Sequence, residues 1–400
     1  MAAAVWDAVI VGARVAGSVL ACHLARRGHR ILVLDRATFP SDTLSTHFFD
    51  PLTTARLSGL GILDAIERCG APAIRRARFA APEAHVEFTG RFAPPLGVAG
   101  GYCIRRVTLD AMLVQAARTA GAEVREGARV TDLLWYEGQA GGVRWTDAGG
   151  RERAEPAQVV IGADGRYSSV ARWVRAPSTA TNAAAAPVYY AYFSGMAGPR
   201  DTVEVLHGAR RTMLVFPTDG ELTCVAVTLP QTEAGAYRAD HERRFRADLG
   251  AIPELAGRLA GAERRGPVRG ATDLDGHVRT PIGPGWALVG DAGVHVHPIT
   301  ARGIGLAVRD AELLAEGLAA ALEGLRPPED ALAEYQALRD HEAVPAYHRS
   351  FAAAATAGAP PSSARITRWR SLAAAPDAAS DRAVNGGALD VAVMAPQDEC

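Results

Sequence analysis

The clearest feature of the sequence is a repeated pattern in which a short apolar run ends in a turn of glycine and aspartate. The runs occupy residues 8–11, 159–161 and 286–289, and they lead into Gly12, into residues 162–165 and into the pair of Gly290 and Asp291. Such runs, bounded by glycine, are typical of strands buried on both faces of a parallel sheet. Because the carboxyl ends of parallel strands meet at one edge of the sheet, the three turns are predicted to converge on one ligand-binding crevice.

The first run opens a predicted βαβ unit. Apolar residues at helical spacing predict a helix over 18–27, and a second strand over 31–34 ends at Asp35. The turn at 12–17 nearly matches the dinucleotide fingerprint G-x-G-x-x-G, which sets backbone amides against a pyrophosphate, with a ribose-binding carboxylate about 20 residues further on. Arg14 replaces the central glycine, so its side chain must point away from the phosphates or bind them through its guanidinium. A structural glycine turn would also fit this stretch, so the wider context decides.

Alternating apolar and polar positions predict an antiparallel sheet in the second half of the chain. The segments span residues 188–193, 202–206, 212–216 and 222–229, separated by glycine, proline and aspartate. The alanine-rich stretch 351–375 carries no motif and is predicted to form helices or loops packed outside the core.

The basic residues are all arginine. The sequence holds 43 of them, no lysine and 44 acidic residues, for a formal net charge of −1. Schiff-base catalysis, an anchoring lysine for pyridoxal phosphate and the lysine of a P-loop are therefore excluded, because a guanidinium stays protonated. The balanced charge disfavours nucleic acid or anionic lipid as a partner.

The cysteines and the N-terminus predict a cytoplasmic protein. The five cysteines are scattered and contain no C-x-x-C pair, which predicts reduced thiols rather than disulfides or a zinc site. The N-terminal apolar run is interrupted by Asp7 and Arg14, so we expect neither a signal peptide nor insertion into a membrane.

In order and spacing, the motifs resemble those of the FAD-dependent class A flavoprotein monooxygenases of the para-hydroxybenzoate hydroxylase fold, a family related to geranylgeranyl reductases and flavin-dependent halogenases. The resemblance extends over residues 5–325 and consists of the turn at 12–17, Asp35 with Arg36, the segment 105–110, the Gly-Ala-Asp-Gly motif at 162–165, and Gly290 and Asp291 with Pro298, Gly303 and Gly305 downstream. It implies an α/β fold, with a Rossmann-like FAD-binding domain, an inserted antiparallel-sheet substrate domain and a C-terminal helical segment. The expected ranges are 1–70, 101–175 and 277–325 for the FAD-binding domain, 71–100 and 176–276 for the substrate domain, and 326–400 for the helical region.

The resemblance also implies a role for each matching residue. Those expected to bind FAD are Gly12, Ala13, Arg14 and Gly17 at the pyrophosphate, Asp35 at the adenosine ribose, Arg36 at the adenine, Arg106 at the phosphate and ribityl region, Asp164 between FAD and the approach of the nicotinamide, Gly290 and Asp291 at the ribityl chain, and Gly303, Ile304 and Gly305 at the N1 and C2=O edge of the flavin. Amides at a helix N-terminus stabilise negative charge at that edge. Asp164 and Asp291 also fit as caps of the helices that follow them, and Arg105 with Arg106 also fits as a solvated pair.

Four residues near these motifs are candidates for catalysis. His47 lies on the loop after the second strand, where it fits a residue that orients substrate or relays a proton and equally a structural histidine bonded to the backbone. His295, His297 and Pro298 lie between the third strand and the next helix, where they are expected to face substrate. No third ligand accompanies the two histidines, so no metal is expected.

The predicted sheet supplies candidates for a substrate pocket. Tyr190, Tyr192, Met213, Phe216 and Pro217 are expected to line an apolar space that excludes water, although each also fits as an ordinary core residue.

The reaction that the resemblance implies is reduction of FAD by NADH or NADPH, addition of O₂ to give a flavin C4a-hydroperoxide, and hydroxylation or epoxidation of an aromatic or polyketide-like small molecule. A double-bond reductase of the geranylgeranyl reductase type and a non-catalytic FAD-binding protein remain alternatives. A halogenase is disfavoured, because that class relies on an active-site lysine and a W-x-W-x-I-P segment, and the sequence has neither. The sequence leaves the substrate, the choice of nicotinamide and the oligomeric state open.

Overall fold

A parallel sheet forms the first layer of the molecule. The computed structural model describes residues 5–208 and 210–374. In this sheet the strands follow the order β18 (Ile282–Gly283), β19 (Trp286–Leu288), β10 (Glu152–Gly162), β1 (Trp6–Val11), β2 (Ile31–Leu34) and β7 (Glu123–Arg125), and the hairpin of β8 (Arg129–Tyr136) and β9 (Gln139–Thr146) extends from β10. β19, β10, β1, β2 and β7 run parallel to one another. The predicted α/β fold class is therefore confirmed.

The βαβ unit and the convergence of the three strands are confirmed. The helix α1 (Val15–Arg26) begins three residues before the predicted start, and β2 matches its predicted bounds. On one side of β1, Val9 pairs with Val160 of β10, and on the other side it pairs with Leu32 of β2. Since β10 also pairs with β19, the three turns that follow β1, β10 and β19 lie side by side at one sheet edge.

Helices cover this sheet with apolar side chains. α1 is buried over most of its length in a cluster shared with α4 (Arg106–Thr119) and α9 (Gly303–Leu322). Two shorter helices, α2 (Pro51–Gly59) and α3 (Leu63–Arg68), add to this cluster, and α5 (Ser169–Trp173) follows β10. The short strands β3 (Phe48–Phe49) and β6 (Tyr102–Cys103) pair with each other.

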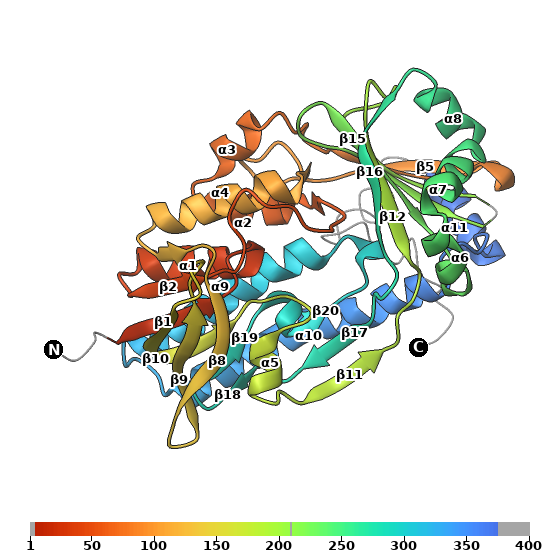
Figure 1. The fold of residues 1–400 in the computed structure, drawn as a ribbon. Coiled ribbons are helices and arrows are strands. Elements are labelled where there is room, and N and C mark those ends of the chain that lie inside the picture. Colours follow the sequence, from red (N-terminus) through yellow and green to blue (C-terminus); the bar gives the residue numbers. More distant parts are fainter. Residues whose placement is uncertain (1–4, 209, 375–400) are drawn as a thin grey trace.

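The second large sheet has seven strands and lies at the other end of the molecule from β1 and β2 (Figure 1). Its order is β16 (Glu263–Ala271), β12 (Val188–Ser194), β15 (Leu222–Thr228), β14 (Thr212–Pro217), β13 (Thr202–His207), β4 (Arg76–Ala81) and β5 (Val86–Arg91). The four segments predicted from alternation correspond to β12, β13, β14 and β15. The pairing is antiparallel except between β13 and β4, which run parallel.

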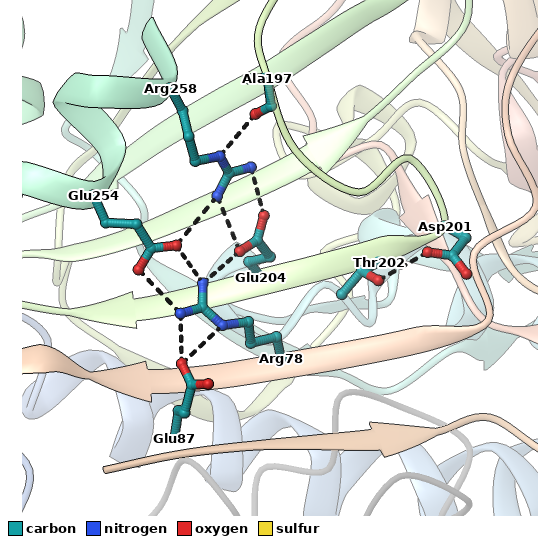
Figure 2. A network of polar contacts seen from close by, with 8 residues as sticks. All are labelled: Arg78, Glu87, Ala197, Asp201, Thr202, Glu204, Glu254 and Arg258. Carbon is teal, nitrogen blue, oxygen red and sulfur yellow. Dashed lines mark hydrogen bonds and ion pairs between the residues drawn. The ribbon is translucent and has the colours of Figure 1, made fainter. Parts of the chain in front are cut away.

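The two faces of the second sheet bury different partners. One face packs on α6 (Ala234–Ala239), α7 (His241–Gly250) and α8 (Pro253–Leu259), which lie outside the sheet in Figure 1. On the same side, Glu204 of β13 is buried between Arg78 of β4 and Arg258 of α8 (Figure 2). Its two carboxylate oxygens accept hydrogen bonds of 2.8 Å from Arg78 and 2.7 Å from Arg258, and Arg78 also donates to Glu254 and Glu87. This network joins α8 to three strands.

The remaining elements are a three-stranded sheet and a long helix that packs on it. A small sheet combines β11 (Ser178–Asn182), β17 (Gly276–Arg279) and β20 (Val294–His295), and the long helix α10 (Pro328–Ala355) packs against it and α9. In residues 5–208 and 210–374, no helix has both the length and the hydropathy needed to cross a membrane.

The expectation that residues 351–375 pack outside the core is wrong for the part that the structure describes. Trp369 of α11 (Ser363–Ala374) is completely buried, with its ring 6.2 Å from that of Phe79 and 5.9 Å from that of Phe88. Leu372 and Phe351 are buried as well. α11 therefore supplies core to the β4–β5 half of the second sheet, and a high alanine content alone did not reveal this role. Residue 375 and the rest of the expected C-terminal region lie outside the described residues.

Candidate functional site

A cavity of about 690 Å³ lies between the carboxyl edge of the parallel sheet and one face of the second sheet. Its lining residues come from the three predicted turns, from the loop after β2, from the start of α9 and from strands β12, β14 and β15. The polar side chains lie on the parallel-sheet side, whereas Val188, Tyr190 and Phe216 form part of a largely apolar wall. Such a cavity suits a long ligand with a polar and an apolar end.

The first turn is closed so tightly that two of its positions have no room for a side chain. Gly12 has φ +106°, and a Cβ there would lie 2.4 Å from the carbonyl oxygen of Ala163. At Gly17 a Cβ would lie 1.9 Å from the carbonyl oxygen of Gly12. The first turn, the start of α1 and the Gly-Ala-Asp-Gly motif are therefore in direct backbone contact, and Gly12 lines the cavity.

Asp35 organises this turn through its carboxylate. One oxygen accepts a 2.7 Å hydrogen bond from the amide of Ala13, and the other accepts a 2.7 Å hydrogen bond from the amide of Ala37. Each carboxylate oxygen has a second acceptor site, so Asp35, which also lines the cavity, keeps capacity for hydroxyl donors. The amide of Ala13, expected at a pyrophosphate, already has this protein partner.

A buried carboxylate holds two of the arginines that line the cavity. Asp110 of α4 is fully buried and forms an ion pair with Arg14, and its other oxygen accepts a 2.9 Å hydrogen bond from Nε of Arg106. Arg14 also donates to the hydroxyl of Ser41 at 2.9 Å. Arg14 and Arg106 both line the cavity, so the carboxylate of Asp110 orients two guanidinium groups at the cavity surface. Arg105 instead faces away to Asp219, at 2.9 Å.

Asp164 acts as a cap and also lines the cavity. Its carboxylate accepts hydrogen bonds from the hydroxyl of Ser168 at 2.5 Å and the amide of Ser169 at 2.6 Å, at the start of α5. Burial raises the pKa of this carboxyl above its usual range, against the effect of these hydrogen bonds. Asp164 therefore accepts hydrogen bonds from the first amides of α5 beside the N-cap residue, Ser168, and it also lies in the cavity lining.

The start of α9 contributes backbone donors. Gly303 and Ile304 line the cavity, and the N-cap residue, Arg302, makes no side-chain capping bond. The first amides of a helix have no partner within it, and the helix dipole makes that end favourable for negative charge. Asp291, in the turn after β19, lines the same cavity.

The structure brings together most, but not all, of the residues expected at the cofactor. The lining includes Gly12, Arg14, Asp35, Arg36, Arg106, Asp164, Asp291, Gly303 and Ile304. The remaining four, Ala13, Gly17, Gly290 and Gly305, lie behind this surface. Gly17 and Gly290 are buried, and Gly305 faces Thr53 of α2.

The three candidate histidines have different surroundings. His47 is fully buried outside the cavity lining, and its Nε2 lies 2.7 Å from the hydroxyl of Tyr192. Burial, together with Arg106, lowers its pKa to about 4, so it is neutral at neutral pH. His297 is also fully buried, bonded to the carbonyl of Ala185, and burial lowers its pKa to about 4. His295 lines the cavity together with Pro298.

Four of the five substrate candidates divide between the two faces of the second sheet, and the fifth, Pro217, is buried outside the cavity lining. Tyr190 and Phe216 line the cavity. Tyr192 packs just behind them, with its ring 5.7 Å from that of His47. Met213 is buried on the opposite face, against α6, α7 and α8, so its side chain is separated from the cavity by the sheet.

Several lining residues carry no motif. They are Asp42, Thr43, Leu44, Ser45 and Thr46 of the loop after β2, Arg129 and Val130 of β8, Trp173 of α5, and Cys224, Ala226, Ala271 and Leu274 on the substrate side. Only the position of the loop directly after the second strand was a usable signal. The structure describes no group of three or more histidine, cysteine, aspartate or glutamate residues that could hold a metal within 5–208 and 210–374.

A family model described as an FAD binding domain matches residues 6–350. Digeranylgeranylglycerophospholipid reductase 2 of Methanothermobacter thermautotrophicus is 28% identical over 341 residues, covering 83% of this chain and 82% of that protein. Kynurenine 3-monooxygenase of Salinispora arenicola is 28% identical over 364 residues, covering 83% and 75%.

Solved structures show the same fold. The myxobacterial chondrochloren halogenase CndH aligns with a TM-score of 0.80 at 23% identity, covering 98% of this chain and 96% of that one. PqsL of Pseudomonas aeruginosa, described as a probable FAD-dependent monooxygenase, aligns with a TM-score of 0.75 at 21% identity, covering 92% and 100%.

Proposed function

The chain belongs to the FAD binding domain family, among relatives that are FAD-dependent oxidoreductases, and from this premise we propose that it is a monooxygenase that uses NADH or NADPH and O₂ to hydroxylate or epoxidise an aromatic or polyketide-like small molecule. The observation that carries the proposal is the cavity of about 690 Å³, with arginines and helix-start amides at one end and the apolar wall of Tyr190 and Phe216 at the other.

The residues present fit FAD. Arg14, Arg106 and the amides at the starts of α1 and α9 suit a diphosphate and an electron-rich flavin edge. Asp35 has acceptor capacity left for ribose hydroxyls, and Asp291 suits the ribityl chain. When bound, FAD would supply hydride acceptance from the nicotinamide and activation of O₂.

The chain's own contribution would be to position substrate and exclude water. Val188, Tyr190, Phe216, Cys224 and Ala226 present mostly apolar atoms, which favour a flat organic ligand over water. The hydroxyl of Tyr190 is buried without a hydrogen-bond partner among the described residues, so it is available to orient an oxygen of the substrate.

His47 is proposed as a positioning residue. It is neutral, and its contact with Tyr192 fixes the aromatic pair behind the cavity wall. His295 and Pro298, which line the cavity, are the better placed of the remaining candidates for direct contact with substrate. His297 is proposed to support the turn before Pro298 through its bond to Ala185.

A double-bond reductase is the second candidate. It is favoured by the 28% identity to a digeranylgeranylglycerophospholipid reductase over 83% of this chain. Halogenation remains disfavoured, because the 400 residues contain no lysine. A non-catalytic FAD-binding role would leave flavin bound without turnover.

The test begins with the purified protein and its flavin content. For the proposed monooxygenase we expect a bound yellow flavin, NADH or NADPH oxidation that a phenolic substrate accelerates, and ¹⁸O from ¹⁸O₂ in the product. Anaerobic reduction of a substrate double bond, without ¹⁸O incorporation in air, would favour the reductase instead. A protein that neither retains nor takes up FAD would overturn both.

A further inference from the structure

The turn that contains Asp291 is held from behind by strand β17. This strand pairs antiparallel with β20, which follows the turn. At the end of the pairing, the amide of Arg279 donates a 2.8 Å hydrogen bond to the carbonyl of Gly293. On the other side of Gly293 the chain bends into the turn at 290–292, so the backbone ladder between the two strands ends there.

Two side chains of β17 continue the contact where the backbone ladder ends. Nη1 of Arg279 donates a 2.9 Å hydrogen bond to the carbonyl of Ala292, and Nε2 of His277 lies 2.9 Å from the carbonyl of Asp291. Residues two apart on a strand point to the same face, so both side chains reach the turn. The carbonyls of three successive residues, Asp291, Ala292 and Gly293, are therefore all bonded to β17.

The contact with the turn fixes the position of the proton on the His277 ring. Burial, together with the charge of Arg279, lowers the pKa of His277 to about 4, so the ring is uncharged at pH 7 and has one N–H. A carbonyl oxygen only accepts hydrogen bonds, so this N–H lies on Nε2 and donates to Asp291. Arg279 is anchored as well, because Arg339, a fully buried residue of α10, donates a 2.9 Å hydrogen bond to its carbonyl.

These bonds determine the direction in which the Asp291 side chain leaves the backbone. The peptide group before Asp291 is fixed by the 2.9 Å hydrogen bond from the amide of Gly293 to the carbonyl of Gly290. The peptide group after Asp291 is fixed by His277. Because a peptide group is planar, fixing both groups sets the position of the Cβ between them. Asp291 lines the cavity, so its carboxylate meets a ligand there in a set orientation.

We propose that His277 and Arg279 are positioning residues for the bound cofactor, which hold the turn so that the carboxylate of Asp291 accepts hydrogen bonds from hydroxyl groups of the ribityl chain. The proposal rests on the proposed function, because it assumes that FAD occupies the cavity with this chain at Asp291. Neither His277 nor Arg279 lines the cavity, so both act through the turn. A small displacement of the turn weakens these hydrogen bonds, since they depend on distance and angle.

The test is titration of the full-length apoprotein with FAD, followed by flavin fluorescence. Arg279→Met removes the charged donor, and we expect FAD to bind about tenfold more weakly, whereas Arg279→Lys, which keeps a cationic donor, should stay within about threefold of the unaltered protein. His277→Leu removes a neutral donor and should weaken binding about fivefold, and His277→Gln, which keeps an N–H, less than about twofold.

A second probe and a second background separate positioning from a general loss of structure. ADP shares the adenosine and diphosphate of FAD but has no ribityl chain, so its affinity, measured by calorimetry, should change by less than about twofold in all four variants. In an Asp291→Ala background, Arg279→Met should weaken FAD binding by less than about a further twofold, because both changes remove the same interaction. A change that only loosened the fold would weaken both probes and would add to the effect of Asp291→Ala.

Arg200→Met is the matched control. Arg200 is also half-buried and donates to two backbone carbonyls, those of Thr218 and Leu222, outside the cavity lining. This variant should bind FAD and ADP as the unaltered protein does.

Three results would overturn the inference alone. They are unchanged FAD affinity in Arg279→Met and His277→Leu, equal losses of FAD and ADP affinity in these variants, and full additivity of Arg279→Met with Asp291→Ala. If Asp291→Ala by itself binds FAD as tightly as the unaltered protein, the proposed place of the cofactor is wrong, and the inference fails with that premise.

Discussion

At the scale of single residues, the cofactor end of the cavity depends on Asp110, a residue that contacts no cavity surface itself. It fixes Arg14 and Arg106, which come from different helix starts, through its two oxygens. The segment that contains it was recognisable in the sequence, but the partnership with Arg14 was not, because it joins residues 96 positions apart. Arg14 takes the place of the central glycine of the G-x-G-x-x-G fingerprint. The buried carboxylate of Asp110 gives this arginine a structural role there, because it holds the guanidinium at the cavity.

Replacement of Asp110 by asparagine tests this support. Asp110→Asn keeps the shape but removes the charge that pairs both arginines, so we expect FAD to bind about tenfold more weakly, equivalent to about 1.4 kcal/mol. Fluorescence titration of the apoprotein with FAD measures the effect. Asp64→Asn, on the exposed surface of α3, is the control and should leave FAD affinity unchanged. Equal affinity for both variants would contradict the role of Asp110.

Gly12 gives a second prediction at this scale. In Gly12→Ala the new Cβ would lie 2.4 Å from a backbone oxygen at φ +106°, so the turn must open. We expect loss of FAD affinity by more than about a hundredfold, since displacement of the turn removes several diphosphate contacts together. The control is Gly28→Ala, which also has a positive φ, +87°, but no atom within 4 Å of the added Cβ. It should lose about 1 kcal/mol of stability and bind FAD normally, and circular dichroism separates misfolding from loss of binding.

At the scale of elements, the strands were the most predictable part of the molecule. Their alternating or continuous apolar patterns are local, and β12 to β15 followed them closely. The same period of two separates Met213 from Phe216, because residues three apart on a strand face opposite sides. The burial of Trp369, by contrast, depends on contact with Phe79 and Phe88 almost 300 residues earlier, which no local pattern in α11 encodes.

The network around Glu204 gives the prediction at this scale. Glu204→Gln removes the charge between Arg78 and Arg258, which are themselves largely buried, so two guanidinium groups lose their shared partner (Figure 2). We expect a loss of about 3–5 kcal/mol in the free energy of unfolding, the usual cost of breaking a buried ion pair. Glu87→Gln, in the same network but 63% exposed, should cost less than about 1 kcal/mol. Urea unfolding of the two variants measures the difference, and similar losses would show that burial of Glu204 is not what matters.

At the scale of the whole molecule, the sequence predicted where a ligand would bind better than what would line its pocket. The convergence of three strand ends follows from the topology of a parallel sheet. The loop at 42–46 and Trp173 reach the same cavity because of how distant elements pack, and their residue types carry no signal of it. The absence of lysine also determines the chemistry of the cavity. Every fixed cation near it, such as Arg14, Arg36 and Arg106, is a guanidinium, and a guanidinium is suited to forked contacts with phosphate or carboxylate.

Buried histidines distributed through the molecule determine how its stability depends on pH. Burial lowers the pKa of His47, His277 and His297 to about 4 and that of His207 to about 3, from the usual 6.5. Between pH 6.5 and pH 4 the unfolded chain therefore binds more protons at these sites than the folded protein, and stability falls as the pH falls through this range. Asp310 has the opposite effect, because burial raises its pKa to about 7 and its contribution is lost as the pH rises towards that value.

Four histidines outweigh one aspartate, so acid should destabilise the protein. We expect the melting temperature at pH 4.5 to lie on the order of 10 °C below that at pH 7, measured by calorimetry at constant ionic strength. Asp310→Asn removes the opposing contribution, so this variant should gain stability relative to the unaltered protein above pH 7, match it near pH 4, and lose more on acidification. A melting temperature that stays level or rises between pH 7 and pH 4.5 would mean that these histidines are protonated within the folded protein. His47 would then carry a charge beside Tyr192, and its proposed role as a neutral positioning residue would fail with the stability prediction.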